Sequence, residues 1–494
     1  MGLIQQVYAG DSVAASVAMP ARLPVRTQWL IGAGVAVFLL LSFLLAQSLV
    51  PIALVLGVAA CWMMLRTPLA SILGFMGINV LITLMPREQG LGGAPTGVDL
   101  ALGGALVIIM GYWFFRIRVV ERQPISGSAS QLSLMLFFPW AVLVTIIGIV
   151  AEHNPADVAI REILNLLPLL ILPVLYERYI IPGSKDENWL IGTILGSGVL
   201  IVFENVLLIR NHLVQAYYLY EVGKATVDLS LAAFLIVMLF SFLMLEKHTW
   251  KVVASTIMLL AEALAVVLSI TRNAYISVAV ALMIIWLLGN RQERKRGIQR
   301  ISIVGAIAAA GILVAAISSR LISLLLKSYW LRLLSTQKLG HDLSLRMRFA
   351  EWSGEWAAIK HSPLLGHGFG ASFKVFDIVL QHHVWQPFSH NSYLYIIFKT
   401  GFIGALLFLT PFFAFMFKAF KLSRLRSLPG RTRIGVRGCF GCMVLLLFAT
   451  NLGPVFDSKT DLMWVGLLWG YLLAVEKQIQ NSKTVSEHQL LNQA

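Results

Sequence analysis

The sequence predicts an all-α polytopic membrane protein with about 12–14 transmembrane helices and one large helical periplasmic loop. Composition is the first indication: 58% of the 494 residues are hydrophobic, 13% are charged, and the mean hydropathy is +0.79. A soluble core requires less apolar surface than this. The second indication is that apolar runs of about 16–22 residues recur along the chain, close to the length that crosses a hydrocarbon core about 30 Å thick.

About fourteen such runs follow one another, and the second and the last are the shortest. They cover residues 28–47, 49–65, 67–85, 98–116, 132–151, 164–182, 188–209, 229–246, 251–270, 273–290, 300–319, 392–417, 438–456 and 461–476. The chain therefore divides into an N-terminal segment (1–27), a transmembrane bundle (28–319), a large loop (320–391), C-terminal transmembrane helices (392–476) and a polar tail expected to be mobile (477–494).

Basic residues orient these spans, because short cytoplasmic loops retain arginine and lysine. Basic residues precede the first span, follow the fourth and twelfth, and separate the tenth from the eleventh. Alternation from these positions places both termini in the cytoplasm and residues 320–391 in the periplasm. That loop is itself basic, but the rule weakens for loops longer than about 60 residues. The orienting residues are Arg22, Arg26, Arg116, Arg118, Arg122, Arg291, Arg294, Lys295, Arg296, Arg300, Lys418, Lys421, Arg424, Arg426, Arg431, Arg433 and Arg437.

The formal net charge of +15 lies mainly in the cytoplasmic loops, so anionic lipid headgroups explain it better than nucleic acid does. Membrane lipids are therefore expected partners, and nucleic acid is not. The spacing of Cys439 and Cys442 matches half of a metal site, but no second cysteine pair completes it, and small packing residues are the favoured interpretation. His382, His383 and His390 have the spacing of no common zinc site. No metal and no cofactor are predicted.

Within the long loop, residues 346–361 are expected to form an amphipathic helix. Phe349, Trp352, Trp356 and Ile359 recur there at spacings of three and four residues. Tryptophan favours the headgroup level of a membrane, so this stripe could lie on the outer leaflet. The alternative is a helix packed on the transmembrane bundle.

Where the loop re-enters an apolar run, His390 and Asn391 are followed by nine residues and then by Gly401 and Gly404. This pattern places a titratable imidazole at a membrane surface. The two glycines, three residues apart on one helix face, would let another backbone or a substrate come close.

Three sequence elements resemble those of the O-antigen ligase and polymerase superfamily and occur in the same order. The resemblance covers roughly residues 250–456. An arginine at the outer end of an earlier span is also expected, and Thr271-Arg272-Asn273 supplies it where the family often has serine before the arginine. The three elements are an Arg348-x-x-x-Trp352 helix, the stretch Pro363-Leu-Leu-Gly-His-Gly, and His390-Asn391 with Gly401 and Gly404.

The resemblance implies an inverting, metal-independent membrane glycosyltransferase in a bacterial inner membrane, with a periplasmic active site and a glycan on undecaprenyl diphosphate as its donor. It also implies that Arg272 and Arg348 bind the diphosphate and that His390 is the general base. The chemistry of these residues agrees, since guanidinium is a planar fork that suits phosphate oxygens and histidine, with a pKa of ~6.5, accepts a proton near neutrality.

Each of these residues has an alternative role. Arg272 could extend to lipid headgroups. Arg348 could pair with Glu351 on its own helix, which would leave the diphosphate to Arg346. His390 could cap a helix. Further candidates for substrate binding are Asn391, Gly401, Gly404 and Asp228.

The sequence does not identify the acceptor of the glycan. The spans ahead of the resembling region and the extended N-terminus favour polymerisation of a surface or secreted polysaccharide, with chain-length or export proteins as partners. A ligase would instead pass the glycan to lipid A core, and a related enzyme to protein. A polysaccharide or lipid transporter is the alternative from another class, but the inverted repeats typical of transporters are not apparent.

Topology reporters test the orientation. Fusions after Gly340 and Ser389 should be active only as periplasmic reporters, and fusions after Arg296 and Arg426 only as cytoplasmic reporters, because basic loops stay in the cytoplasm. A cytoplasmic signal after Ser389 would contradict a periplasmic active site.

Overall fold

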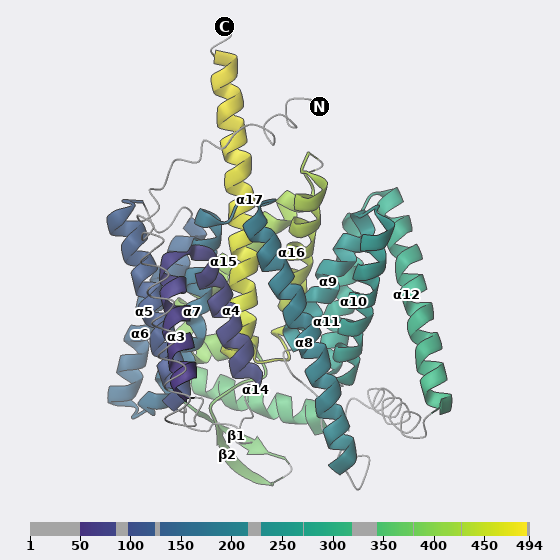
Figure 1. Cartoon of the computed structure of the whole chain (residues 1–494). Coiled ribbons are helices and arrows are strands. Elements are labelled where there is room, and N and C mark those ends of the chain that lie inside the picture. Colours follow the sequence, from purple (N-terminus) through teal and green to yellow (C-terminus); the bar gives the residue numbers. More distant parts are fainter. Residues whose placement is uncertain are drawn as a thin grey trace. The chain divides into compact units, whose positions relative to one another are not determined.

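A computed structural model describes residues 50–84, 97–123, 129–215, 229–269, 271–318, 343–378, 380–425 and 427–491. The chain divides into two units, residues 1–63 and 64–494, and the second contains the contacts described below. The described residues are mostly helical, with one two-stranded sheet among them, which confirms the predicted all-α polytopic class (Figure 1).

The elements follow in this order. They are α3 (Val50–Arg66), α4 (Pro68–Leu84), α5 (Gly97–Phe115), the π-helical turn η1 (Arg116–Val120), α6 (Ala129–Ala151), α7 (Ala156–Tyr179), α8 (Lys185–Gln215), α9 (Leu229–Leu245), α10 (Thr249–Leu268), α11 (Arg272–Leu288), α12 (Arg291–Ser318), α14 (Leu343–His361), β1 (Phe373–Asp377), β2 (His382–Gln386), α15 (Ser392–Ser423), α16 (Gly430–Ala449), the 3-10 turn η4 (Val455–Asp457) and α17 (Lys459–Leu491).

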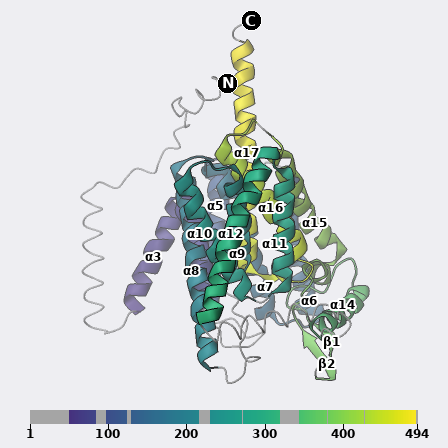
Figure 2. The ribbon, with the colours of Figure 1, turned by 90° about the vertical axis from the view of Figure 1, so that its right-hand side faces the viewer.

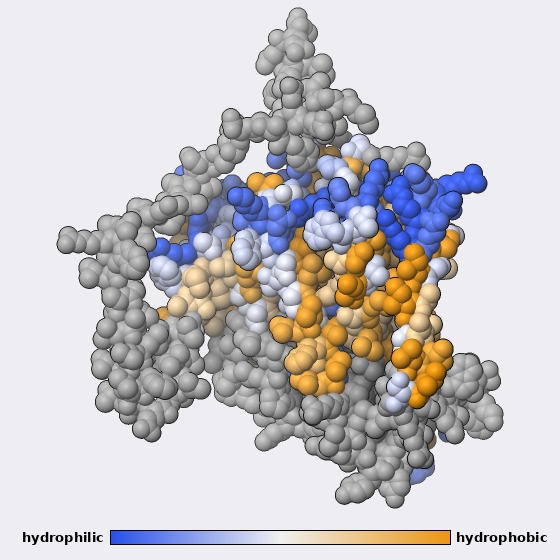
Figure 3. All heavy atoms as spheres, turned by 45° about the vertical axis from the view of Figure 1, so that its right-hand side comes forward, coloured by the Kyte–Doolittle hydropathy of each residue, from blue (hydrophilic) through white to orange (hydrophobic). Residues whose placement is uncertain are grey.

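Among the described residues, six helices are long and apolar enough to cross a membrane, namely α6, α7, α8, α10, α15 and α16. Shorter apolar segments lie in α3, α4, α9 and α11. On the face drawn in Figure 3, hydrophilic side chains gather at one end of the helices and hydrophobic ones lie below them, as expected where lipid replaces water. The predicted span 28–47 falls outside the described residues.

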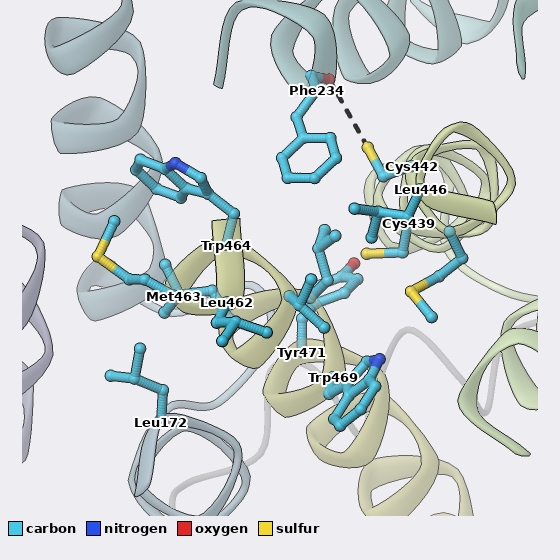
Figure 4. Packing of buried hydrophobic residues seen from close by; sticks show 14 of the residues in the cluster. Leu172, Phe234, Cys439, Cys442, Leu446, Leu462, Met463, Trp464, Trp469 and Tyr471 are labelled. Carbon is cyan, nitrogen blue, oxygen red and sulfur yellow. Dashed lines mark hydrogen bonds between the residues drawn. The ribbon is translucent and has the colours of Figure 1, made fainter. Parts of the chain in front are cut away.

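Helices α7 and α17 form a close contact in the core. Gly466 and Gly470 of α17 face α7, where a Cβ would lie 2.9 Å from the Pro168 carbonyl oxygen and 2.4 Å from Tyr176 Cβ, respectively. Figure 4 shows side chains of α17 among those of α7, α9 and α16. Cys439 and Cys442 are fully buried there, with Cys442 Sγ 3.7 Å from the carbonyl oxygen of Phe234, so both cysteines pack as small interior residues.

The polar tail, which was expected to be mobile, is helical, because α17 continues as one helix to Leu491 (Figure 1). Residues 477–491 include glutamate, lysine and glutamine, which favour helices, and they extend a helix that is already anchored by packing.

Helix α15 is interrupted at Gly401, whose φ of 67° and ψ of 179° are non-helical. Phe402 N–H therefore donates to the Pro363 carbonyl at 2.8 Å. The carbonyls of Phe398 and Lys399 instead accept from His367 N–H at 2.9 Å and Gly368 N–H at 2.8 Å. The loop after α14 thus takes over hydrogen bonds that the broken helix cannot make itself, and it is fixed against α15.

The same loop is joined to α7 by a buried ion pair. Lys399 Nζ of α15 donates to both carboxylate oxygens of Glu162, at 2.8 and 3.0 Å, and to the Ala371 carbonyl at 2.8 Å. Gly370 N–H donates to Glu162 Oε2 at 2.7 Å. The Lys399 side chain is 0% exposed and that of Glu162 5%, so each charge depends on the other.

Removal of either charge of this pair should therefore destabilise the folded protein. Lys399→Met should destabilise the folded protein by about 3–5 kcal/mol, because it leaves a buried carboxylate without its cation. The double variant Lys399→Met with Glu162→Gln removes both charges and keeps an acceptor for Gly370, and it should recover much of the loss. Thermal unfolding in detergent measures both. A single variant as stable as the wild type would show that the pair is not required.

Candidate active site

Helix α14 presents two carboxylates to the protein interior. Glu351, Glu355 and Ile359 lie one turn apart, on one face, with exposed fractions of 4%, 0% and 2%. Of the predicted stripe, Phe349 is 53% and Trp356 43% exposed, whereas Trp352 is half-buried and Ile359 is buried. The helix occurs where it was predicted, and its two glutamates and Ile359 face the interior.

The hairpin of β1 and β2 covers this face of α14. Phe373 and Val375 of β1 form a small apolar core with Ile359 of α14 and Phe398 of α15. Gly354 permits the close approach, because a Cβ there would lie 2.4 Å from a strand carbonyl oxygen. Figures 1 and 2 show α14 and both strands together, at the end of the helices opposite the C-terminus of α17.

His390 is held by Glu351. Glu351 Oε2 lies 2.9 Å from His390 Nδ1, and Glu351 Oε1 accepts the His390 backbone N–H at 2.9 Å. Gln386 Nε2 of β2 also donates to Oε1, at 3.0 Å. The carboxylate is 5% exposed and the imidazole 37%. A carboxylate accepts hydrogen bonds only, so Nδ1 carries the proton in this contact and the lone pair of a neutral ring is then on Nε2.

Glu355 lies one turn deeper. Its Oε2 accepts from Ser389 Oγ at 2.7 Å, and Ser389 Oγ accepts the backbone N–H of Asn391 at 3.0 Å. The pKa of Glu355 is raised to about 8, mainly by burial. The nearby negative charge of Glu351 also raises this pKa, whereas the Ser389 hydrogen bond and Lys399 lower it. A carboxyl group with this pKa is protonated near neutrality.

Asn391 caps α15, since its side-chain oxygen accepts from Tyr393 N–H at 3.1 Å and Leu394 N–H at 3.2 Å. The capping role that was an alternative for His390 thus belongs to its neighbour. The imidazole of His390 points to Glu351 instead.

Arg272 is the first residue of α11, at the same end of the bundle as His390. Asn273 Nδ2 donates to the Ala449 carbonyl of α16 at 3.0 Å, and the next carbonyl, that of Thr450, accepts from Ser392 N–H at 2.9 Å. The start of α11 and the start of α15 are therefore joined through the end of α16. Arg272 is half-buried there.

The other two candidate arginines, Arg346 and Arg348, lie on α14 before Glu351. Arg348 is half-buried and Arg346 is exposed. Glu351, the alternative partner of Arg348, is bound by His390 and Gln386. Arg348 is thus one turn of helix from the carboxylate that holds the candidate base.

Gly401 and Gly404 admit neighbouring chain segments. A Cβ at Gly401 would lie 2.0 Å from the Leu364 carbonyl oxygen, and one at Gly404 would lie 2.8 Å from Trp140. Of the two expectations for this pair, close approach of a backbone is what the structure shows at Gly401. Asp228 lies outside the described residues.

His382 and His383 belong to the exposed hairpin strand β2, where His382 Nδ1 is 2.9 Å from the Leu380 carbonyl and His383 packs edge-on against Phe376. Within the described ranges, histidine, cysteine, aspartate and glutamate form no group of three that could hold a metal ion.

Sequence reasoning missed Glu351 as the partner of His390, and it missed Glu355, Ser389 and the Glu162–Lys399 pair. Two signals were available. Glutamates at positions i and i+4 share one helix face. A lysine at position 399 within a predicted span is an expensive placement that usually has a purpose.

One family model matches the segment of the chain that contains this site. Residues 256–409 match a family model described as O-antigen ligase. The matched segment contains Arg272, α14, the hairpin, His390 and both glycines of α15. No curated protein matches the chain.

Proposed function

Because residues 256–409 match a family model described as O-antigen ligase, we propose that the chain belongs to the O-antigen ligase and polymerase superfamily. We propose that it transfers a glycan from undecaprenyl diphosphate to an acceptor hydroxyl at the periplasmic face of a bacterial inner membrane. The match to this family supports glycan transfer from a lipid-linked donor. The side of the membrane follows from the basic-loop alternation in the sequence. The geometry of His390 and Glu351 is the observation that supports the chemistry.

In the proposed reaction His390 is the general base. Nε2 of its partly exposed imidazole takes the proton of the acceptor hydroxyl, while Glu351 holds Nδ1–H and stabilises the imidazolium that forms. The acceptor oxygen attacks the anomeric carbon as the bond from that carbon to the diphosphate oxygen breaks. The bonding electrons leave with the lipid diphosphate. A single displacement of this kind inverts the anomeric centre, and it requires only a base and a stabilised leaving group.

Arg272 and Arg348 are proposed to bind the diphosphate. Two guanidinium groups can each donate paired hydrogen bonds to phosphate oxygens, and they stay charged at any working pH. They would stabilise the charge that accumulates on the leaving group. Hydrogen bonds from α11 through α16 to α15 support this for Arg272, which begins α11. For Arg348 the support is its place on α14, three residues before Glu351.

For the acceptor we propose a second lipid-linked glycan, which makes the enzyme a polymerase of a surface or secreted polysaccharide. The helices α3 to α9, which precede the matched segment, support this choice. Lipid A core is the alternative acceptor, and protein is a further one. Vesicles supplied with one acceptor at a time distinguish them: a ladder of products indicates polymerisation, and a single transfer to lipid A core indicates ligation.

The base and its carboxylate can be tested together. His390→Ala should lower the transfer rate by roughly 10²–10⁴-fold, the usual contribution of a general base. Glu351→Gln should lower it by at least about tenfold, because an amide cannot stabilise the imidazolium. The assay uses reconstituted vesicles with lipid-linked donor and acceptor. His382→Ala and His383→Ala are matched controls and should change the rate little. A wild-type rate in His390→Ala would exclude His390 as the base.

The arginines call for a different substitution. Arg272→Lys and Arg348→Lys keep the charge but lose the planar fork, so each should lower transfer by about tenfold or more at normal expression. Rates measured against donor concentration separate weaker binding from slower chemistry. Full activity in both variants would favour the headgroup and salt-bridge roles. A loss in Arg346→Lys alone would assign the diphosphate to Arg346.

A further inference from the structure

We propose that Glu355 is a second positioning residue, which holds Ser389 from the protein interior as a neutral carboxylic acid and so fixes the turn that presents His390 to Glu351. The inference rests on the proposed role of His390 as the base. It assigns a neutral carboxyl group to Glu355 and a carboxylate to Glu351, one turn away on α14.

The contacts form a continuous path from the interior to the base. Glu355 is 0% exposed, and its Oε2 accepts from Ser389 Oγ. Ser389 Oγ accepts the N–H of Asn391 and lies 3.3 Å from the carbonyl of the same residue. Ser389 and Asn391 flank His390 in sequence, so the conformation of the turn depends on Glu355.

The charges around Glu355 explain why it is neutral. From α14 it faces Glu351, whose carboxylate is engaged with His390. From α15 it faces Lys399 and Tyr395. The ammonium of Lys399 bonds to Glu162 and to the Ala371 carbonyl, so Glu355 has no cation of its own in the described structure. None of the described residues forms a hydrogen bond with Glu355 Oε1.

A buried carboxylate without a partner is costly, and the group keeps its proton instead. The pKa of Glu355, raised to about 8 by burial and by the Glu351 charge, agrees with that conclusion. Below about pH 8 the neutral acid accepts from Ser389 without repelling Glu351. Above it, a second buried negative charge would lie next to the carboxylate that orients His390, and the turn should be disturbed.

The pH dependence of transfer tests this proposal. One pH unit above the pKa only about a tenth of the carboxyl groups stay protonated, so the wild-type rate at pH 9 should be about tenfold below that at pH 7. Glutamine imitates the neutral acid. Glu355→Gln should stay within about threefold of the wild-type rate at pH 7 and should lose the decline at pH 9. Glu355→Ala removes the acceptor and should be at least about tenfold slower at both pH values.

Glu351→Gln is the matched variant one turn away, and it should be slow already at pH 7. If Glu355→Gln is as slow as Glu351→Gln at pH 7, Glu355 acts as an anion and the proposal is wrong. An alkaline decline that is unchanged in Glu355→Gln would also overturn it.

An infrared titration keeps this test independent of the proposed function. One component of the carbonyl band of protonated carboxyl groups should disappear as the pH rises through about 8, and the difference spectrum of wild type minus Glu355→Gln should isolate it. The measurement needs no substrate. If this component is present but no variant affects glycan transfer, the proposed function fails and the charge state of Glu355 stands. A wild-type protein without such a component would refute the neutral carboxyl directly.

Discussion

The buried ion pair between Lys399 and Glu162 is the constraint on which the rest of the site depends. A lysine inside an apolar helix needs a partner, because an isolated charge in hydrocarbon is expensive. Glu162 on α7 supplies that partner, and the pair also binds Gly370 N–H and the Ala371 carbonyl. The ion pair therefore fixes the loop after α14 at one position on the bundle.

The position of this loop in turn determines where α14 and the turn at His390 lie. The break at Gly401 leaves the carbonyls of Phe398 and Lys399 without helical partners, and the loop that Lys399 anchors supplies N–H groups to both. Because this loop directly follows α14, the helix is placed over the start of α15. Its carboxylate face then meets the turn that carries His390. Backbone hydrogen bonds that a straight helix would satisfy internally are used here to position His390, the proposed base.

The segment that matches the family does not hold its site alone. Residues 256–409 contain the proposed base His390, both glutamates of α14 and the candidate arginines, but Glu162 belongs to α7. Tyr395, one turn before Lys399, donates to Asp457 of η4 at 3.2 Å, and Asn165 of α7 donates to the Asp457 carbonyl at 2.9 Å. Helices outside the matched segment thus provide the frame for the candidate active site, and α17 packs against α7.

The sequence by itself determined the membrane class, the helix in the long loop, the order of the motifs and the position of His390, since composition and local spacing report these directly. The tertiary structure alone decided how the charges pair. Glu351 and His390 are 39 residues apart, and Lys399 and Glu162 are 237 apart. The stripe of Phe349, Trp352, Trp356 and Ile359 gave no indication that Glu351 is buried, because its partner His390 lies 39 residues away in the sequence. Periodicity carries no information about that partner, and only the folded chain brings the two together.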